Sequence, residues 1–176
     1  CKFTNPVVVP DDDEGVEVPA GEPGTIWFES ESRFEYHNDP EKTAASRHPN
    51  GWSTLGDVGY VDDEGFLYLT DRKAYMIITG GVNVYPQEAE NVLAMHPSVA
   101  DVAVFGVPDD DFGEAVKAVV EPADGVEPDD ALAEELTAWL RGKVARYMVP
   151  KSIDFTDALP RLPTGKLYKA ALREKY

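Results

Sequence analysis

The hydrophobic pattern of this chain changes its period near residue 75, and this change constrains the fold more strongly than any other feature. Before it, short β-prone runs such as residues 25–28 alternate with turn-rich segments such as the acidic run at 11–15. Two further β-prone runs flank an Asp/Gly turn at 62–65 and predict a β-hairpin. Residues 1–70 are therefore expected to be rich in β-structure.

After residue 75 the pattern alternates between strands and helices. A glycine pair between two apolar runs predicts a second hairpin at 76–84. Pro86, followed by early glutamates, predicts the start of a helix, and leucines at helical spacing predict another from Pro128 onward. Strands are expected at 99–107, 115–121 and 152–155, and a short helix at the end of the chain. The fold class is thus α+β: a small mixed α/β domain with a β-hairpin and a three-stranded sheet packed by helices, preceded by a β-rich segment.

Charge is distributed unevenly along the chain. The net charge of −17 argues against a surface that binds nucleic acid. Residues 1–140 hold 7 Lys/Arg against 30 Asp/Glu, whereas residues 141–176 hold 9 against 3. A basic end on an acidic body predicts a surface that meets an anion, either an acidic neighbouring domain or a polyphosphate ligand.

Composition excludes several classes of protein and of site. The hydrophobic fraction of 43% is ordinary, and no apolar run approaches the about 20 residues of a membrane span. The first residues do not resemble a signal peptide, so a cytoplasmic location is expected. Cys1 has no second cysteine to pair with or to share a metal. His37, His48 and His96 lack the spacing of metal ligands and are expected at the surface, so no metal site is expected in this chain.

Three short segments carry the functional signal. They are GWSTLGD at 51–57, DRKAYMIITGGVNVYPQE at 71–88 and LPRLPTGK at 159–166. In this order they resemble the late motifs of the adenylate-forming superfamily, which contains acyl-CoA synthetases, aryl-CoA ligases, adenylation domains that load carrier proteins, and beetle luciferases. Each motif alone is weak, but the ordered set is specific and covers nearly the whole chain. The resemblance indicates the C-terminal part of an acyl-CoA synthetase.

The resemblance implies a division into three parts. Residues 1–70 would be the end of a large N-terminal adenylation domain, residues 71–74 a hinge, and residues 75–176 a mobile C-terminal domain. Ala74 occupies the hinge position, where many relatives carry Lys or Asp; alanine supplies the backbone torsion without a charge. The phosphate loop and the acyl pocket belong to the rest of the N-terminal domain, which is the expected partner. This chain alone is therefore expected to be inactive.

Lys166 is the candidate catalytic residue. It lies in a loop that contains proline and glycine, and we expect the lysine to be presented on a flexible arm. When a carboxylate attacks the α-phosphate of ATP, a compact ammonium can bridge both anions and stabilise the charge that builds on phosphorus. An exposed lysine is otherwise an ordinary solubilising residue. The resemblance implies the catalytic role.

Two further residues are candidates for binding the nucleotide. A carboxylate at Asp57 can accept hydrogen bonds from both ribose hydroxyls, and Arg72 can add donors from another side. Without the family context, Asp57 would be a turn-capping residue and Arg72 a member of a surface ion pair. The resemblance implies that both bind ATP or AMP together with Lys166.

The glycine pair and its neighbours are candidates for the second half-reaction. Gly80 and Gly81 either form a tight hairpin turn or, as in CoA-forming relatives, line the path of the pantetheine arm. Asn83 falls where relatives place a polar residue that steadies the acyl-adenylate. Ile78 stands where plant-type aryl-CoA ligases often carry a second lysine, which favours a fatty acyl or related substrate. Domain alternation about Ala74 would bring the glycines and Lys166 to the active site in turn.

The function expected for the complete enzyme is therefore ATP-dependent acid–CoA ligation. A small carboxylic acid and Mg²⁺-ATP would give acyl-AMP and pyrophosphate, and coenzyme A would then give acyl-CoA and AMP. One alternative is an adenylation domain that loads a carrier protein; free CoA is the expected acceptor, because no carrier-domain sequence appears up to Tyr176. Another is a non-catalytic regulatory module, which the presence of Asp57, Arg72 and Lys166 disfavours.

Overall fold

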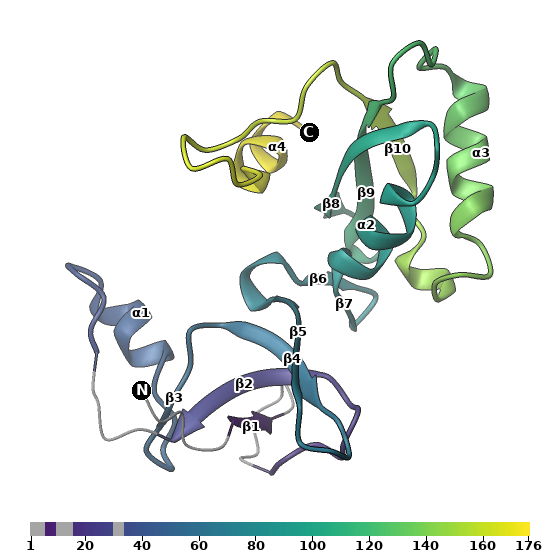
Figure 1. Cartoon of the computed structure of the whole chain (residues 1–176). Coiled ribbons are helices and arrows are strands. Elements are labelled where there is room, and N and C mark those ends of the chain that lie inside the picture. Colours follow the sequence, from purple (N-terminus) through teal and green to yellow (C-terminus); the bar gives the residue numbers. More distant parts are fainter. Residues whose placement is uncertain (1–5, 10–15, 30–33) are drawn as a thin grey trace. The chain divides into compact units, whose positions relative to one another are not determined.

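A computed structural model describes residues 6–9, 16–29 and 34–176 of the 176-residue chain. Cys1 and the acidic turn at 11–15 lie outside the described residues. The chain divides into two compact units, Cys1–Ala74 and Tyr75–Tyr176 (Figure 1).

The first unit is built on an antiparallel sheet of five strands. The strands follow the order β1 (Pro6–Val9), β2 (Gly24–Glu29), β4 (Asp57–Val61) and β5 (Leu67–Arg72), and the short β3 (Trp52–Ser53) pairs with β2. Val7, Val9 and Trp27 are buried together on one side of this sheet. One short helix, α1 (Pro40–Ala45), is capped by Asp39, whose side chain accepts a hydrogen bond from the Lys42 amide.

The β4–β5 hairpin depends on a tight turn and on one glycine. The Asp62 carboxylate accepts hydrogen bonds from the amides of Glu64 and Phe66 and thereby closes the turn. A Cβ atom on Gly59 would lie 2.1 Å from the carbonyl oxygen of Tyr68, so only glycine allows the two strands to approach here. The hairpin predicted from the Asp/Gly turn is therefore present.

The second unit contains a mixed five-stranded sheet. The long strands β8 (Val99–Asp109) and β9 (Gly113–Pro122) form an antiparallel pair, and β10 (Ser152–Phe155) runs parallel to β9. The hairpin of β6 (Ile77–Thr79) and β7 (Val82–Val84) joins β9 through Thr79 and Gly113. The predicted hairpin and three-stranded sheet are thus parts of one sheet.

Side-chain alternation along β8 explains how this sheet is buried on both faces. Val102 and Val104 point to one face, where α2 (Pro86–Ala94) and α3 (Asp130–Leu140) cover them. Ala103 and Phe105 point to the other face, where they meet Leu172 of α4 (Lys169–Lys175). The apolar run of β8 therefore has no polar face, as a strand between two layers requires.

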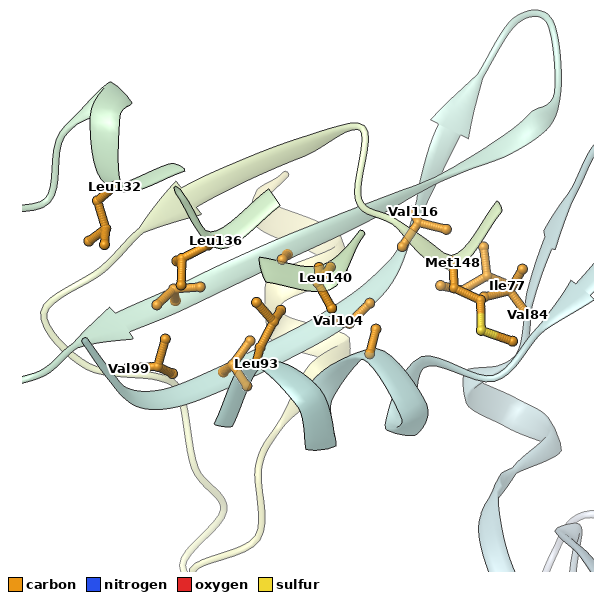
Figure 2. Packing of buried hydrophobic residues seen from close by; sticks show 14 residues of the cluster. Ile77, Val84, Leu93, Val99, Val104, Val116, Leu132, Leu136, Leu140 and Met148 are labelled. Atoms are coloured by element: carbon orange, nitrogen blue, oxygen red, sulfur yellow. The ribbon is translucent and has the colours of Figure 1, made fainter. Parts of the chain in front are cut away.

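The larger core lies between the sheet and the helices α2 and α3. Figure 2 shows Leu93, Leu136 and Leu140 directed toward Val104 of the sheet. These four side chains are fully buried. The indole nitrogen of Trp139 also donates a hydrogen bond to the carbonyl oxygen of Val92 at 2.9 Å, which ties α3 to α2. The α+β fold class predicted from the sequence is confirmed.

One prediction about the histidines was wrong. His37 is exposed, but His48 and His96 are 8% and 5% exposed. The His48 ring stacks on Trp52 and meets Trp27 edge-on, with ring centroids 4.9 and 5.1 Å away. His48 Nδ1 accepts a hydrogen bond from the amide of Asn50. A lone histidine can be buried when its ring faces pack on aromatics and its nitrogens find partners, and spacing in the sequence does not reveal this.

Candidate functional site

Asp57 and Arg72 form a pair across the β4–β5 ladder. They are direct partners in the strand register, and Arg72 Nε lies 3.1 Å from Asp57 Oδ1. The side chains are 24% and 59% exposed for Asp57 and Arg72, respectively, so this pair faces solvent on one side. The structure therefore brings together the two residues predicted to bind the ribose. It also confirms the ion pair that Arg72 could form without a ligand.

The end of β5 leads into the predicted hinge. Asp71 and Arg72 still belong to β5, and Lys73–Tyr75 form a single 3-10 turn. The Lys73 amide donates a hydrogen bond to the Gly56 carbonyl at 2.9 Å, which holds this turn against the segment before Asp57. Ala74 is exposed and is the last residue of the first unit. A hinge at Ala74 stays a prediction.

Gly80 and Gly81 form the turn of the β6–β7 hairpin. Both have positive φ, at 57° and 80°, a conformation that L-residues rarely adopt. A Cβ on Gly80 would lie 3.2 Å from the ring of Phe112, whereas a Cβ on Gly81 would meet nothing within 4 Å. The backbone conformation thus explains both glycines, and open space lies beside Gly81.

Ile78 and Asn83 face each other across the same hairpin. They are partners in the β6–β7 register, and both are exposed. Val84, the next residue, is fully buried, so the strand alternation turns Asn83 away from the core. Asn83, which is predicted to steady the acyl-adenylate, therefore lies directly opposite Ile78, the position where plant-type aryl-CoA ligases often carry a lysine.

A cavity of about 510 Å³ opens beside the glycine turn. Its rim carries two half-exposed aromatic rings, Phe112 and Tyr147, and two basic side chains, Arg146 and Lys151. No motif in the sequence pointed to these residues. The signal that could have identified them was Phe112 itself, because a phenylalanine in a short acidic turn between two strands has no hydrophobic core to pack into.

An ion pair fixes one side of this cavity. Lys151 Nζ lies 2.6 Å from Asp109 Oδ2, and the Asp109 carboxylate also accepts hydrogen bonds from the amides of Asp111 and Phe112. The hydrogen bond from Lys151 is the main reason that the pKa of Asp109 lies below its usual range. The same bond raises the pKa of Lys151. The basic group at the rim is therefore charged at neutral pH.

Lys166 lies on a small hairpin of its own. Backbone hydrogen bonds of 2.8 Å run from Leu162 to Lys166, from Gly165 to Leu162 and from Tyr168 to Pro160. The predicted flexible arm is thus a closed, hydrogen-bonded turn, because the proline-containing loop folds back on itself.

The Lys166 side chain itself is exposed. In the part of the chain that the structure describes, its ammonium has no ion-pair or hydrogen-bond partner. Arg161 braces the hairpin from the side: its Nη1 donates to the Gly165 carbonyl at 2.7 Å, and its Nη2 pairs with Asp101 on β8. The backbone next to Lys166 is held, and the ammonium remains available to a ligand.

The buried ion pair of Glu90 and Lys169 was also missed. Glu90 shares the buried side of α2 with Ala89 and Leu93. Lys169 Nζ lies 2.7 Å from Glu90 Oε1, and each side chain is 7% exposed. A glutamate inside an apolar helical stripe was the signal, because such a carboxylate needs a buried partner.

The predicted site residues are divided between the two units. Asp57 and Arg72 belong to the first unit, and Gly80, Gly81, Asn83 and Lys166 belong to the second. None of the helices in the described ranges has the length and apolar character that a membrane-spanning helix requires. The same ranges hold no cluster of three or more residues able to bind a metal.

The second unit is thus a small α+β domain that presents an exposed lysine on a braced hairpin. Residues 88–166 match the family described as the AMP-binding enzyme C-terminal domain, and the chain belongs to the adenylate-forming superfamily.

Three comparisons illustrate this relation. The chain is 45% identical over 163 residues to a feruloyl-CoA synthase of Amycolatopsis sp, covering 92% of this chain and 32% of that protein. It is 42% identical over 165 residues to the long-chain-fatty-acid–CoA ligase FadD13 of Mycobacterium tuberculosis, covering 93% and 32%. The solved structure of ATP-bound MatB from Rhodopseudomonas palustris superposes with a TM-score of 0.83 at 36% identity, covering 99% and 34%. The chain spans about a third of the length of the curated relatives it matches.

Proposed function

We propose that this chain is the C-terminal part of an AMP-forming acid–CoA ligase. The observation that carries the proposal is the exposed ammonium of Lys166, which has no partner among the described residues although the backbone around it is held by hydrogen bonds. Nine Lys/Arg against three Asp/Glu in residues 141–176 give this end of the chain a positive field that favours a polyphosphate.

In the first half-reaction, Lys166 would act on the α-phosphate of ATP. A carboxylate oxygen of the acid forms a bond to the α-phosphorus, and the bond to the bridging oxygen of pyrophosphate breaks. The ammonium would contact both the carboxylate and an α-phosphate oxygen, which holds the reactants together and stabilises the developing charge. ATP would enter as its Mg²⁺ complex, since Mg²⁺ commonly binds through substrate phosphates.

Asp57 and Arg72 would hold the ribose of the nucleotide. Their existing ion pair uses Nε of the arginine and one carboxylate oxygen, and both side chains are partly exposed. Ribose hydroxyls would then donate to the Asp57 carboxylate, while the arginine keeps that carboxylate ionised and oriented. Asn83 would steady the acyl-adenylate from the β6–β7 hairpin.

In the second half-reaction, the thiolate of coenzyme A would attack the acyl carbonyl and expel AMP. The open space at Gly81 lets a thin pantetheine arm pass along the backbone. The cavity beside it suits the nucleotide end of the acceptor, because its aromatic rim can stack on a base and its basic rim can bind phosphates. This cavity favours free CoA over a carrier protein.

Rotation about Ala74 would serve the two half-reactions in turn. The division of the chain into two compact units directly after Ala74 supports this proposal. By their names, the relatives act on aromatic and on long-chain acids alike, so the preference for a fatty acyl substrate, drawn from Ile78, stays a prediction. The chain by itself is proposed to be inactive, because the phosphate loop and the acyl pocket would lie in the rest of the enzyme.

Replacement of Lys166 in the complete enzyme tests this proposal. Lys166→Ala should lower acyl-AMP formation, measured by pyrophosphate exchange, by roughly a hundredfold or more, because a charge that acts in the transition state is lost. Thioester formation from preformed acyl-AMP should remain near the wild-type rate. Lys175→Ala, which removes another exposed lysine, is the matched control. Equal losses in both half-reactions would contradict the proposed role of Lys166.

A further inference from the structure

A buried ion pair anchors the helix that directly follows the Lys166 hairpin. Lys169 is the first residue of α4, and its Nζ lies 2.7 Å from Glu90 Oε1 on α2. The same oxygen of Glu90 accepts a hydrogen bond from the Val104 amide at 2.6 Å. The ammonium of Lys169 also lies 5.1 Å from the ring centroid of Tyr75. Three separate elements therefore meet at one lysine.

This arrangement needs an explanation other than stability. Burying two charges costs desolvation that their attraction offsets only in good geometry, and apolar residues of similar size often serve a fold as well. What an ion pair supplies instead is a defined position, because its charged hydrogen bonds fix distance and direction. Here the position defined is that of α4, a helix of seven residues whose buried apolar contact is made by Leu172.

The contact with Tyr75 gives the pair a second consequence. Tyr75 is the first residue of the second unit and directly follows Ala74, the proposed hinge. Lys169 lies three residues after Lys166. A short path of direct contacts thus runs from the residue after the hinge, through the Lys169 ammonium, to the hairpin that carries Lys166.

We propose that Lys169 is a positioning residue for Lys166. Its pair with Glu90 and its contact with Tyr75 make the Lys166 hairpin move as a rigid part of the second unit whenever the unit turns about Ala74. This inference rests on the proposed function, in which the Lys166 ammonium must reach the α-phosphate. Arg161 supports the hairpin from its exposed side, and Lys169 fixes its base.

The first test measures order and needs no activity. The variant Lys169→Met/Glu90→Gln removes both charges yet leaves an amide oxygen for the Val104 amide, so the second unit should still fold. In the 176-residue chain, hydrogen exchange at the amides of Leu162, Gly165 and Tyr168 should become at least tenfold faster. The amides of β9 should exchange as in the wild type. Lys175→Met, which replaces an exposed lysine on the same helix, should leave the exchange rates of the hairpin amides and of the β9 amides unchanged.

Two results would overturn the proposal in this test. If all amides of the second unit became faster by the same factor, the pair would serve only global stability. If the three hairpin amides kept their wild-type rates, the pair would not hold the hairpin at all. Both results are independent of whether the complete enzyme forms acyl-AMP.

The second test measures the two half-reactions in the complete enzyme. The double variant should lower the kcat of adenylation about ten- to a hundredfold, because misplacing a reacting group by about 1 Å costs that much. The KM for ATP and the rate of thioester formation from preformed acyl-AMP should stay unchanged, and Lys169→Arg should recover part of the adenylation rate. Equal losses in both half-reactions, or no recovery by arginine, would contradict a positioning role. If the wild-type enzyme formed no acyl-AMP, the proposed function would be refuted instead. The hydrogen-exchange test would then still decide whether Lys169 and Glu90 hold the hairpin.

Discussion

Gly81 offers a way to separate backbone strain from obstruction of the acceptor path. Its φ of 80° would strain any L-residue, and its missing Cβ faces open space. Gly81→Ala and Gly81→Leu should therefore share one cost in folding, about 1–2 kcal/mol for the left-handed conformation. For a unit of this size that corresponds to a decrease in Tm of roughly 4–16 °C. Thermal unfolding of the chain should show nearly equal decreases for the two variants.

The two variants should differ in catalysis by the complete enzyme. Leucine adds carbon atoms that project into the space proposed for the pantetheine arm, whereas alanine adds one methyl group. A displacement of the acceptor by about 1 Å costs roughly a hundredfold in rate, which equals about 3 kcal/mol of activation free energy. Gly81→Leu should therefore slow thioester formation from preformed acyl-AMP by about this factor and leave pyrophosphate exchange unaffected.

Two results with these variants would refute this reasoning. If alanine slowed thioester formation as much as leucine, strain in the turn and not obstruction would explain the loss. If leucine slowed both half-reactions equally, Gly81 would not belong to a face used only in the second. Gly80→Ala is a less direct probe, because its Cβ would press on the Phe112 ring at 3.2 Å.

Three other outcomes are expected. Asp57→Asn should raise the KM for ATP roughly tenfold or more in the complete enzyme, since a charged hydrogen bond contributes about 1.5–3 kcal/mol; the urea midpoint of the chain should shift little, because the ion pair faces solvent on one side. Leu136→Ala should lower the free energy of unfolding by about 2–5 kcal/mol in urea titrations, whereas Met95→Ala, at a 67% exposed position, should change it by less than about 0.5 kcal/mol. Asp109→Asn should lose the stability that the Lys151 pair supplies at neutral pH. That contribution is complete above the unfolded pKa of about 3.9 and is lost as pH falls through the lowered folded pKa, so the urea midpoints of mutant and wild type should converge at acid pH. Constant separation of the midpoints down to pH 2 would contradict the assigned pKa shift.

The sequence predicted local structure best where one residue type imposes it. The Asp/Gly turn before Phe66 predicted a hairpin, and the proline at Pro86, which fixes φ, predicted the start of a helix. The glycine pair at Gly80 permits the positive φ of a tight turn and predicted a second hairpin. All three elements lie at these places. The apolar run of β8 identified a strand, because β-branched residues dominate it. These signals are short in range and do not depend on distant parts of the chain.

Features that depend on long-range packing could not be predicted. The run of β8 is apolar on both faces, and the sequence does not tell which helix covers which face. His48 is buried because Trp27 and Trp52 enclose it, and Glu90 is buried because Lys169 approaches from a helix 79 residues later. Phe112 and Tyr147 come together at the cavity rim only after β9 and the segment before β10 are placed. The residues in each of these contacts are not related by helix or strand periodicity, so the sequence alone does not indicate that they meet.

The hydrogen-bonded hairpin around Lys166 has a consequence for the thermodynamics of substrate binding. Ordering a backbone residue costs about 1–2 kcal/mol in conformational entropy, and a loose loop would lose that entropy when ATP binds. Here the backbone bonds of residues 160–168 form when the domain folds, so what remains to be ordered is the lysine side chain alone. ATP binding should therefore show only a small entropic penalty from this segment, namely that of ordering one lysine side chain.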